Sequence, residues 1–220
     1  MIVGNTQAKD SATGLLLYSN VDGKPIQNRE FSIIGYGVPD FTGGLNNSLT
    51  MGNMNLSFLI DFKSGGDIYS GTNSMLTKAG FHKQTLMGRD GEAPLTVTGM
   101  FVDPNDWSNG TKETRTLIKG QASTYWDTFA DVASDKFTYD ASFIKLRQIT
   151  LGYTMPKKWF RQTPVKSLML SFVARNLAIL YKNSENIDPE SSYTNSNGQG
   201  LDYFGFPATR SYGFNLRAIF

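Results

Sequence analysis

Asn55-Leu56-Ser57-Phe58-Leu59-Ile60-Asp61-Phe62-Lys63 alternates apolar and polar side chains, with Leu59 as the one exception. The even-numbered residues are large and apolar, and this period of two predicts a β-strand with two unlike faces. Just upstream, residues 45–51 alternate in the same way, and Gly52-Asn53 separates the two runs. Two alternating runs joined by a glycine-containing pair predict a β-hairpin over residues 45–63.

Three further segments, 143–153, 167–181 and 212–220, carry a similar alternation. In the first of them the apolar residues change parity near Arg147-Gln148, which predicts a bulge or a change of face. Pro156 ends this segment, because proline cannot donate to a strand ladder. The sequence therefore predicts about five strands, the last of which ends on the aromatic Phe220.

The predicted strands are joined by connections of very unequal length. The turns near Gly52 and Pro156 are short, whereas residues 64–140 and 182–207 form long connections. Such lengths are uncommon in compact soluble domains, but transmembrane β-barrels have short turns on one side and long loops on the other. Helical spacing predicts short helices inside the first long segment, around 68–79 and, after a Thr124-x-x-Asp127 capping pattern, around 126–133.

The composition excludes several functional classes. Only 18% of the 220 residues are charged, against about 25% in soluble domains, so part of the surface is expected to meet something other than water. A net charge of +2 does not suggest a nucleic-acid partner. Without cysteine, and with His82 as the single histidine, no metal site or cofactor is predicted, and His82 is expected at the surface. No apolar run approaches the ~20 residues of a spanning helix.

Several blocks of the chain resemble, in order, the C-terminal end of the SusC/RagA-like family of TonB-dependent outer-membrane importers of Bacteroidetes. The blocks are Pro39-Asp40-Phe41-Thr42-Gly43-Gly44-Leu45-Asn46-Asn47, Leu56-Ser57-Phe58-Leu59-Ile60-Asp61, Tyr139-Asp140-Ala141-Ser142-Phe143-Ile144-Lys145-Leu146-Arg147, Leu151-Gly152-Tyr153, Ala174-Arg175-Asn176-Leu177, Asn186-Ile187-Asp188-Pro189-Glu190 and Thr209-Arg210-Ser211-Tyr212-Gly213-Phe214-Asn215-Leu216. Residues 85–116 match no part of this pattern.

The resemblance implies an all-β fold, in which the chain is an antiparallel segment of a transmembrane β-barrel of about 22 strands. Long extracellular loops, about 65–140 and 182–208, would carry the short helices. Residues 1–41 would form a preceding strand or loop region, and residues 42–220 the C-terminal barrel strands. The plug domain that precedes the barrel in such importers is not found here, so Met1 is expected to be an internal start or a truncation.

The same resemblance implies a function and a set of partners. The intact protein would import oligosaccharides or oligopeptides across the outer membrane, together with a SusD-like surface lipoprotein. Energy would come from the TonB complex acting on the plug, and one face of each strand would contact the lipid bilayer. The last strand would present the signal read by the barrel assembly machinery, carried by Tyr212, Phe214, Leu216 and Phe220. No enzymatic activity is implied.

Aromatic residues in the long segments are the candidate ligand contacts, because their faces can stack on sugars or pack against peptides. They are Tyr125, Trp126, Tyr193, Tyr203 and Phe204. The alternative is that some of them, Trp126 and Phe204 among them, fill small cores that fold these loops.

Two other functional classes remain open at this point: a soluble or surface β-sandwich that binds carbohydrate, and a β-rich glycoside hydrolase. A hydrolase needs two carboxyl groups a few ångströms apart, one of them with a raised pKa. Asp188-Pro189-Glu190 offers two carboxylates, but their place in a polar connection favours a solvated turn.

Overall fold

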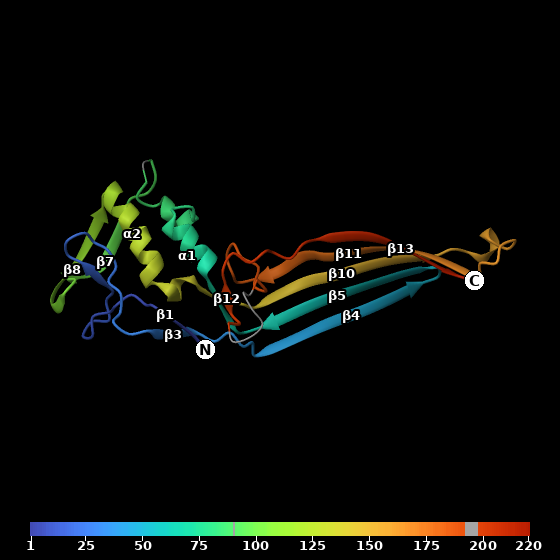
Figure 1. The fold of residues 1–220 in the computed structure, drawn as a ribbon, viewed down its shortest axis with the longest axis horizontal. Helices are drawn as coiled ribbons and strands as arrows, with labels where there is room; N and C mark the ends of the chain where they lie inside the picture. Colours follow the sequence, from blue (N-terminus) through green and yellow to red (C-terminus); the bar gives the residue numbers. More distant parts are fainter. Residues whose placement is uncertain (90, 192–197) are drawn as a thin grey trace. The chain divides into compact units, whose positions relative to one another are not determined.

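The computed structural model describes residues 1–89, 91–191 and 198–220. It divides the chain into two compact units (Figure 1). Unit 1 consists of Met1–Val38, Asp67–Tyr139 and Ser192–Gly205, and unit 2 of Pro39–Gly66, Asp140–Ser191 and Phe206–Phe220. Two of the segments of unit 1, 67–139 and 192–205, are therefore insertions between segments of unit 2 along the chain.

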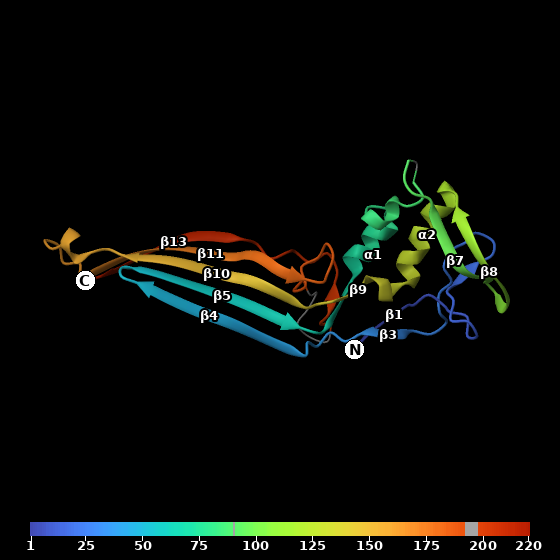
Figure 2. The same cartoon turned by 180° about the vertical axis from the view of Figure 1, so that it is seen from behind.

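Unit 2 is built on one five-stranded antiparallel sheet with the strand order β13-β11-β10-β5-β4 (Figures 1 and 2). Its strands are β4 (Phe41–Met51), β5 (Met54–Ser64), β10 (Phe143–Thr154), β11 (Ser167–Lys182) and β13 (Ser211–Ile219). The predicted hairpin is confirmed as β4 and β5, and Gly52 in its turn has a positive φ of 58°, which costs a glycine little. The short helix η3 (Lys157–Trp159) lies between β10 and β11.

One face of this sheet is apolar from edge to edge. Leu49, Leu56, Leu151, Phe172 and Phe214 are successive cross-strand partners and form a single row across all five strands. Partners in adjacent strands have side chains on the same face, so the alternation seen in each strand adds up to a continuous surface. The next row, Met51, Met54, Tyr153, Leu170 and Leu216, is apolar in the same way.

The opposite face is polar and lined by small side chains. The row between the two apolar ones consists of Thr50, Asn55, Gly152, Ser171 and Asn215. The neighbouring row adds Ser48, Ser57 and Thr150. Val173, the partner of Thr150 on β11, is the apolar exception in this row. Apart from it, the central rows place apolar residues on one face and polar or small residues on the other, as expected of a sheet whose two faces meet different environments.

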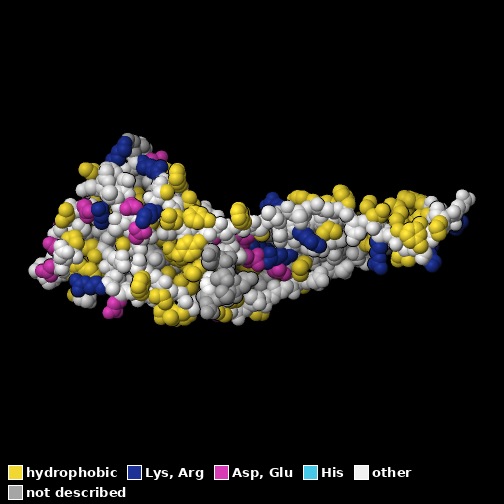
Figure 3. Space-filling view, in the orientation of Figure 1, with side chains coloured by type: hydrophobic (Ala, Val, Ile, Leu, Met, Phe, Trp, Pro, Cys, Tyr) yellow, Lys and Arg dark blue, Asp and Glu magenta, His cyan; other side chains and the backbone are white. Residues whose placement is uncertain are grey.

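The apolar face remains uncovered. Leu49 is 49% exposed and Phe214 is 79% exposed, and Figure 3 shows hydrophobic side chains at the surface along the strands. A β-sandwich must bury one face of each sheet against a second layer. This exposure argues against the sandwich alternative for unit 2, and a continuous exposed apolar surface is typical of sites that contact another protein or a membrane.

The bulge predicted near Arg147-Gln148 is confirmed. Leu146 pairs with Ile60 and Gln148 with Leu59, so Arg147 is an extra residue relative to β5. The insertion moves the apolar set from even positions to odd ones without changing the face on which they lie. Within the described residues, β4 and β13 each pair on one side only, so closure of the sheet and the number of strands in the whole protein remain predictions.

Unit 1 is a smaller mixture of short sheets and helices. Its strands form three sheets: β1 (Ile2–Gly4) with β3 (Ser32–Gly35); β2 (Leu17–Ser19) with β7 (Leu95–Asp103) and β8 (Asp106–Leu117); and β12 (Leu201–Asp202) with β6 (Asp67–Ser70) and β9 (Thr138–Asp140). Its helices are α1 (Gly71–Lys78), α2 (Lys119–Val132), η1 (Lys83–Leu86) and η2 (Ser134–Phe137). No helix in the described part of the chain is long and apolar enough to cross a membrane.

Both predicted helices exist as α1 and α2, but the predicted start of the second is wrong. The helix begins at Lys119, and the side chain of Gln121 accepts a hydrogen bond from the backbone N–H of Ile118. Thr124 therefore lies inside the helix, where its hydroxyl donates to backbone carbonyl groups of the preceding turn. A Thr-x-x-Asp pattern has no capping role once the helix has already started.

Candidate functional site

A cluster of charged side chains lies on unit 2, where β10 and β5 meet the segment that follows β11. Lys145 and Arg147 come from β10, and Asp61, the cross-strand partner of Lys145, comes from β5. Asp188 and Glu190 come from the segment after β11. The strands hold the two cations and the connection brings two carboxylates to them from more than forty residues away along the chain.

The five side chains form one continuous chain of ion pairs. Lys145 Nζ binds Asp188 Oδ1 and lies 2.6 Å from Glu190 Oε2. Arg147 binds the other oxygen of Glu190 and lies 2.6 Å, through Nε, from Asp61 Oδ2. Side chains of Lys145 and Asp188 are 5% and 8% exposed, whereas those of Arg147, Asp61 and Glu190 are between a fifth and a third exposed. The centre of the cluster is therefore buried, and the side chains at its edge are partly exposed to solvent.

The electrostatics match this geometry. Burial alone would raise the pKa of Asp188, but hydrogen bonds from Lys145 and from the backbone of Glu190 and Ala208 outweigh it and lower that pKa. Burial likewise acts to raise the pKa of Glu190, and hydrogen bonds from Arg147 and Lys145 reverse its effect. Both carboxyl groups are held as anions, so neither is suited to donate a proton as a glycosidase acid must.

Local backbone geometry brings the two carboxylates into place. Asn186 adopts a positive φ of 60°, a conformation that asparagine tolerates better than most residues. The carbonyl oxygen of Ile187 accepts hydrogen bonds from Lys182 Nζ and Ser184 Oγ, and Asp188 Oδ1 accepts one from the backbone N–H of Glu190. The expectation of a solvated turn at 188–190 is wrong, because Asp188 is buried against Lys145 and Glu190 is paired with both Lys145 and Arg147.

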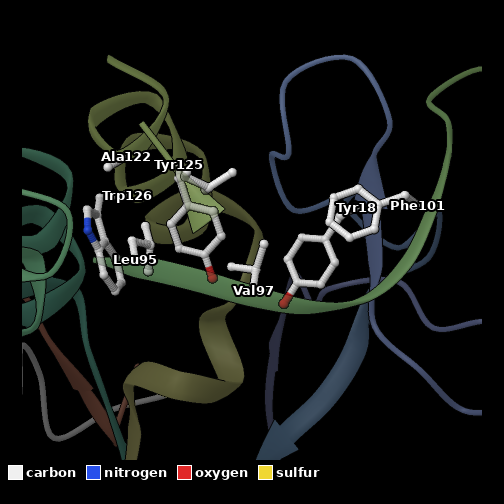
Figure 4. Close-up of a cluster of buried hydrophobic side chains, with 8 residues drawn as sticks. Tyr18, Leu95, Val97, Phe101, Ala122, Tyr125 and Trp126 are labelled. Atoms are coloured by element: carbon white, nitrogen blue, oxygen red, sulfur yellow. The ribbon is translucent and has the colours of Figure 1, made fainter. Parts of the chain in front are cut away.

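Two of the predicted ligand-binding aromatics lie in the core of unit 1. Tyr125 and Trp126 are 6% and 7% exposed and pack in a cluster with Tyr18, Leu95 and other side chains of β7 and α2 (Figure 4). Their ring centroids are 5.1 Å apart in an edge-to-face arrangement, and Trp126 Nε1 donates to the carbonyl oxygen of Met87 at 3.1 Å. Packing explains both residues without a ligand.

The other predicted aromatics are placed differently. Tyr203 and Phe204 are 48% and 61% exposed, and Phe204 has a positive φ of 54°. Tyr203 lies 6.0 Å from Tyr69, measured between ring centroids, and both line a cavity of about 370 Å³ with Phe31 and Met75. Tyr193 lies outside the described residues. Ligand binding by these aromatics stays a prediction.

His82 is buried, so its predicted place at the surface is wrong. It is 5% exposed, and its Nδ1 accepts a hydrogen bond from the backbone N–H of Gln84 at the start of η1. No cluster of potential metal ligands occurs among the residues that the structure describes.

The predicted assembly signal lies on the edge strand β13. Tyr212, Phe214 and Leu216 project from the apolar face and are each more than 60% exposed. Phe220 follows the strand, and its carbonyl oxygen accepts a hydrogen bond from Lys166 Nζ. The exposure makes these side chains available to another protein or to lipid, but recognition by the assembly machinery stays a prediction.

Comparison with known proteins gives two kinds of match, although no family model matches the chain. The chain is 27% identical over 98% of its length to TonB-dependent receptor P3 of Formosa agariphila, and 24% identical over 80% of its length to TonB-dependent receptor P39 of the same organism. It spans 20% and 16% of these two relatives.

Among solved structures, the RagAB peptide importer in its open-open state matches the whole chain with a TM-score of 0.59 at 20% identity. Its closed-closed state matches 99% of the chain with a TM-score of 0.57 at 16% identity. The chain covers 22% of each matched chain. At these identities the structural likeness shows the fold, and the two comparisons together confirm the resemblance, and the outer-membrane location, expected from the sequence.

Proposed function

We propose, from the relationship of this chain to the TonB-dependent receptors of the outer membrane, that it forms part of the wall and mouth of a nutrient importer. The observation that carries this proposal is the pair of apolar rows that cross all five strands of unit 2. Water does not favour such a surface, whereas a bilayer does. The apolar face would contact acyl chains, and the face with small polar residues would line the interior.

The charged cluster would fix the connection 183–191 to the interior face of the wall. Asp188 and Glu190 can reach Lys145 and Arg147 only if this connection folds back over the polar side of β10. A loop held by buried ion pairs has fewer conformations than a free loop. Cargo binding would therefore cost less conformational entropy, because the loop is already ordered. The cluster is therefore proposed as an anchor for the mouth and not as a reactive site.

The cargo is proposed to be an oligopeptide or an oligosaccharide. RagAB is a peptide importer, whereas the names of TonB-dependent receptors P3 and P39 specify no cargo. By analogy the whole protein would work with a SusD-like surface lipoprotein, with the TonB complex acting through a plug, and with the barrel assembly machinery. Tyr203 and Phe204, which remain accessible, would contribute to ligand contact.

A matched pair of substitutions in the full-length protein tests the proposal. Ile60→Arg puts a charge on the apolar face and should cost about 2–4 kcal/mol of folding free energy if that position is near the bilayer midplane. Ser57→Arg is the control on the polar face, where Ser57 pairs with Ser48 and Thr150 and has small neighbours. Folded protein is measured in isolated outer membranes by heat-dependent gel mobility.

The expected result is a large loss of folded protein for Ile60→Arg and near-normal folding for Ser57→Arg. Equal yields for the two variants would mean that the faces have similar environments, and the assignment of lipid and interior sides would be wrong.

A further inference from the structure

Beside the charged cluster, unit 2 has a cavity of about 200 Å³ with an unusual lining. It is formed by residues of β10 and β11 and by the segments 186–188 and 207–210. Four of the lining residues are cationic, Lys145, Arg147, Lys182 and Arg210, and the one acidic lining residue is Asp188. In a chain with so few charges, four cations around one small cavity require an explanation.

The four cations are not equally engaged. Lys145 and Arg147 are paired with three carboxylates, those of Asp188, Glu190 and Asp61, so the ion-pair cluster itself has one more negative than positive charge. Lys182, by contrast, donates to the carbonyl oxygen of Ile187 at 2.8 Å, a neutral acceptor. Neither Lys182 nor Arg210 makes an ion pair with any of the described residues. Both residues are exposed, and no carboxylate of the described residues is paired with either of these two positive charges.

The backbone around the cavity is shaped by two residues in a sparsely populated conformation. Asn176 and Asn186 both line the cavity and have φ values of 51° and 60°. They are two of the three non-glycine residues with positive φ in the described parts of the chain. Left-handed residues outside glycine are uncommon and gather at binding sites, where the surrounding structure holds them.

We propose that this cavity binds an anionic group, a carboxylate or a sulfate, of a small soluble ligand. Arg210 offers the planar fork that pairs with two oxygens of such a group, and Lys182 adds a second charge. The cavity is smaller than those that hold a whole drug-sized molecule. It therefore accepts only the acidic end of a larger ligand.

Chemical modification of arginine tests the site directly, with inorganic sulfate as the probe. The full-length protein in detergent micelles is treated with phenylglyoxal, and mass spectrometry follows Arg210 and the exposed control Arg161, with chloride at matched ionic strength as the reference. Ligand at about four times its Kd should slow modification of Arg210 about fivefold. Arg161, in the connection between β10 and β11, should react at the same rate in both salts.

Three variants separate binding from general charge effects. Lys182→Gln should abolish the protection of Arg210 by sulfate, and Lys182→Arg should retain it. Lys158→Gln removes one exposed cation in η3 and should leave the protection unchanged. Calorimetric titration with sulfate supplies a readout that does not depend on the reactivity of Arg210.

Equal protection of Arg210 and Arg161, or no saturable sulfate binding by calorimetry, would overturn the proposal. Protection by dispersed anionic phospholipid but not by sulfate would assign the cavity to a lipid headgroup and would overturn it as well. The test measures binding alone, so its failure leaves the proposed importer role untouched, and failure of transport leaves the site untouched.

Discussion

Replacing Lys145 with methionine should release the connection 183–191 from the sheet. Methionine keeps most of the volume of the lysine stem but removes the ammonium group that binds Asp188 and Glu190. Glu190 retains Arg147, whereas Asp188, with an 8% exposed side chain, keeps backbone N–H donors only. Removing one partner from a buried ion pair costs about 3–5 kcal/mol, because the other charge remains buried.

The opening of this connection can be followed by proteolysis at Glu185 in the full-length protein. If cleavage requires opening, a change of about 3–5 kcal/mol raises its rate at least about a hundredfold. A second change, Asp188→Asn, should restore much of the protection to the Lys145→Met variant, because an unpaired amide costs less to bury than an unpaired carboxylate.

Lys24→Met provides the matched control, since Lys24 pairs with Asp22 at 2.9 Å and both side chains are about a third exposed. Surface pairs of this kind contribute about 1 kcal/mol or less. If Lys145→Met were cleaved at Glu185 no faster than the Lys24→Met variant, the cluster would not anchor the connection.

Three further predictions concern other parts of the chain. Folding lowers the pKa values of Asp188 and Glu190, so their contribution to the stability of the fold is complete above their ordinary pKa values of 3.8 and 4.5 and is lost as the pH falls below these values. The urea concentration at the unfolding midpoint should therefore decrease as the pH is lowered through this range. A midpoint that does not change with pH would contradict this prediction. Trp126→Ala should destabilise unit 1 by about 3–5 kcal/mol in urea unfolding, whereas Tyr203→Ala, at a half-exposed position, should change its stability little; similar losses would refute the difference in role. Deleting Phe220 should reduce insertion into the outer membrane while export to the periplasm continues, and wild-type surface levels would rule out a terminal signal.

The sheet of unit 2 was predictable because its strands alternate apolar and polar residues with few exceptions. The run from Leu56 to Phe62 and the turn at Gly52 specify the β4–β5 hairpin, and the change of apolar parity around Arg147 specifies the bulge. In each case a local pattern determines which face a side chain occupies. The faces alone exclude slips by one residue, and the turn at Gly52 sets the register of the hairpin.

The hairpin of β7 and β8 was missed for a physical reason. In strand β8, polar residues (Thr, Lys, Glu and Arg) occupy even-numbered and odd-numbered positions alike, and most of them are exposed. The strand therefore lacks the alternation of apolar and polar residues that identifies a strand. Its stability comes from the β7 ladder and from threonine pairs across it, such as Thr98 with Thr114 at 2.9 Å. Only β7, with Leu95, Val97 and Phe101 buried, carried a readable signal.

The charged cluster could not be predicted because its partners are distant in sequence. Nothing in Asp188-Pro189-Glu190 shows that the connection folds back onto β10, and no short spacing links these residues to Lys145 or Asp61. A weaker signal was present: Lys145 and Arg147 are cations inside a predicted strand of a chain that has few charges. Buried charges of this kind need partners.

If the apolar face of the sheet contacts lipid, residues of the two faces should differ in their access to lipid-soluble and water-soluble molecules. Because this chain has no cysteine, single cysteines at Phe58 and Ser57 add no competing thiol within it, and nitroxide labels at these two positions report opposite faces. Collision rates with oxygen, which concentrates in lipid, and with a water-soluble nickel complex are measured by electron paramagnetic resonance on the full-length protein in bilayers. We expect oxygen-dominated collisions at position 58 and nickel-dominated or sterically shielded behaviour at position 57, because the two side chains lie on opposite faces. Nickel-dominated collisions at position 58 would contradict it.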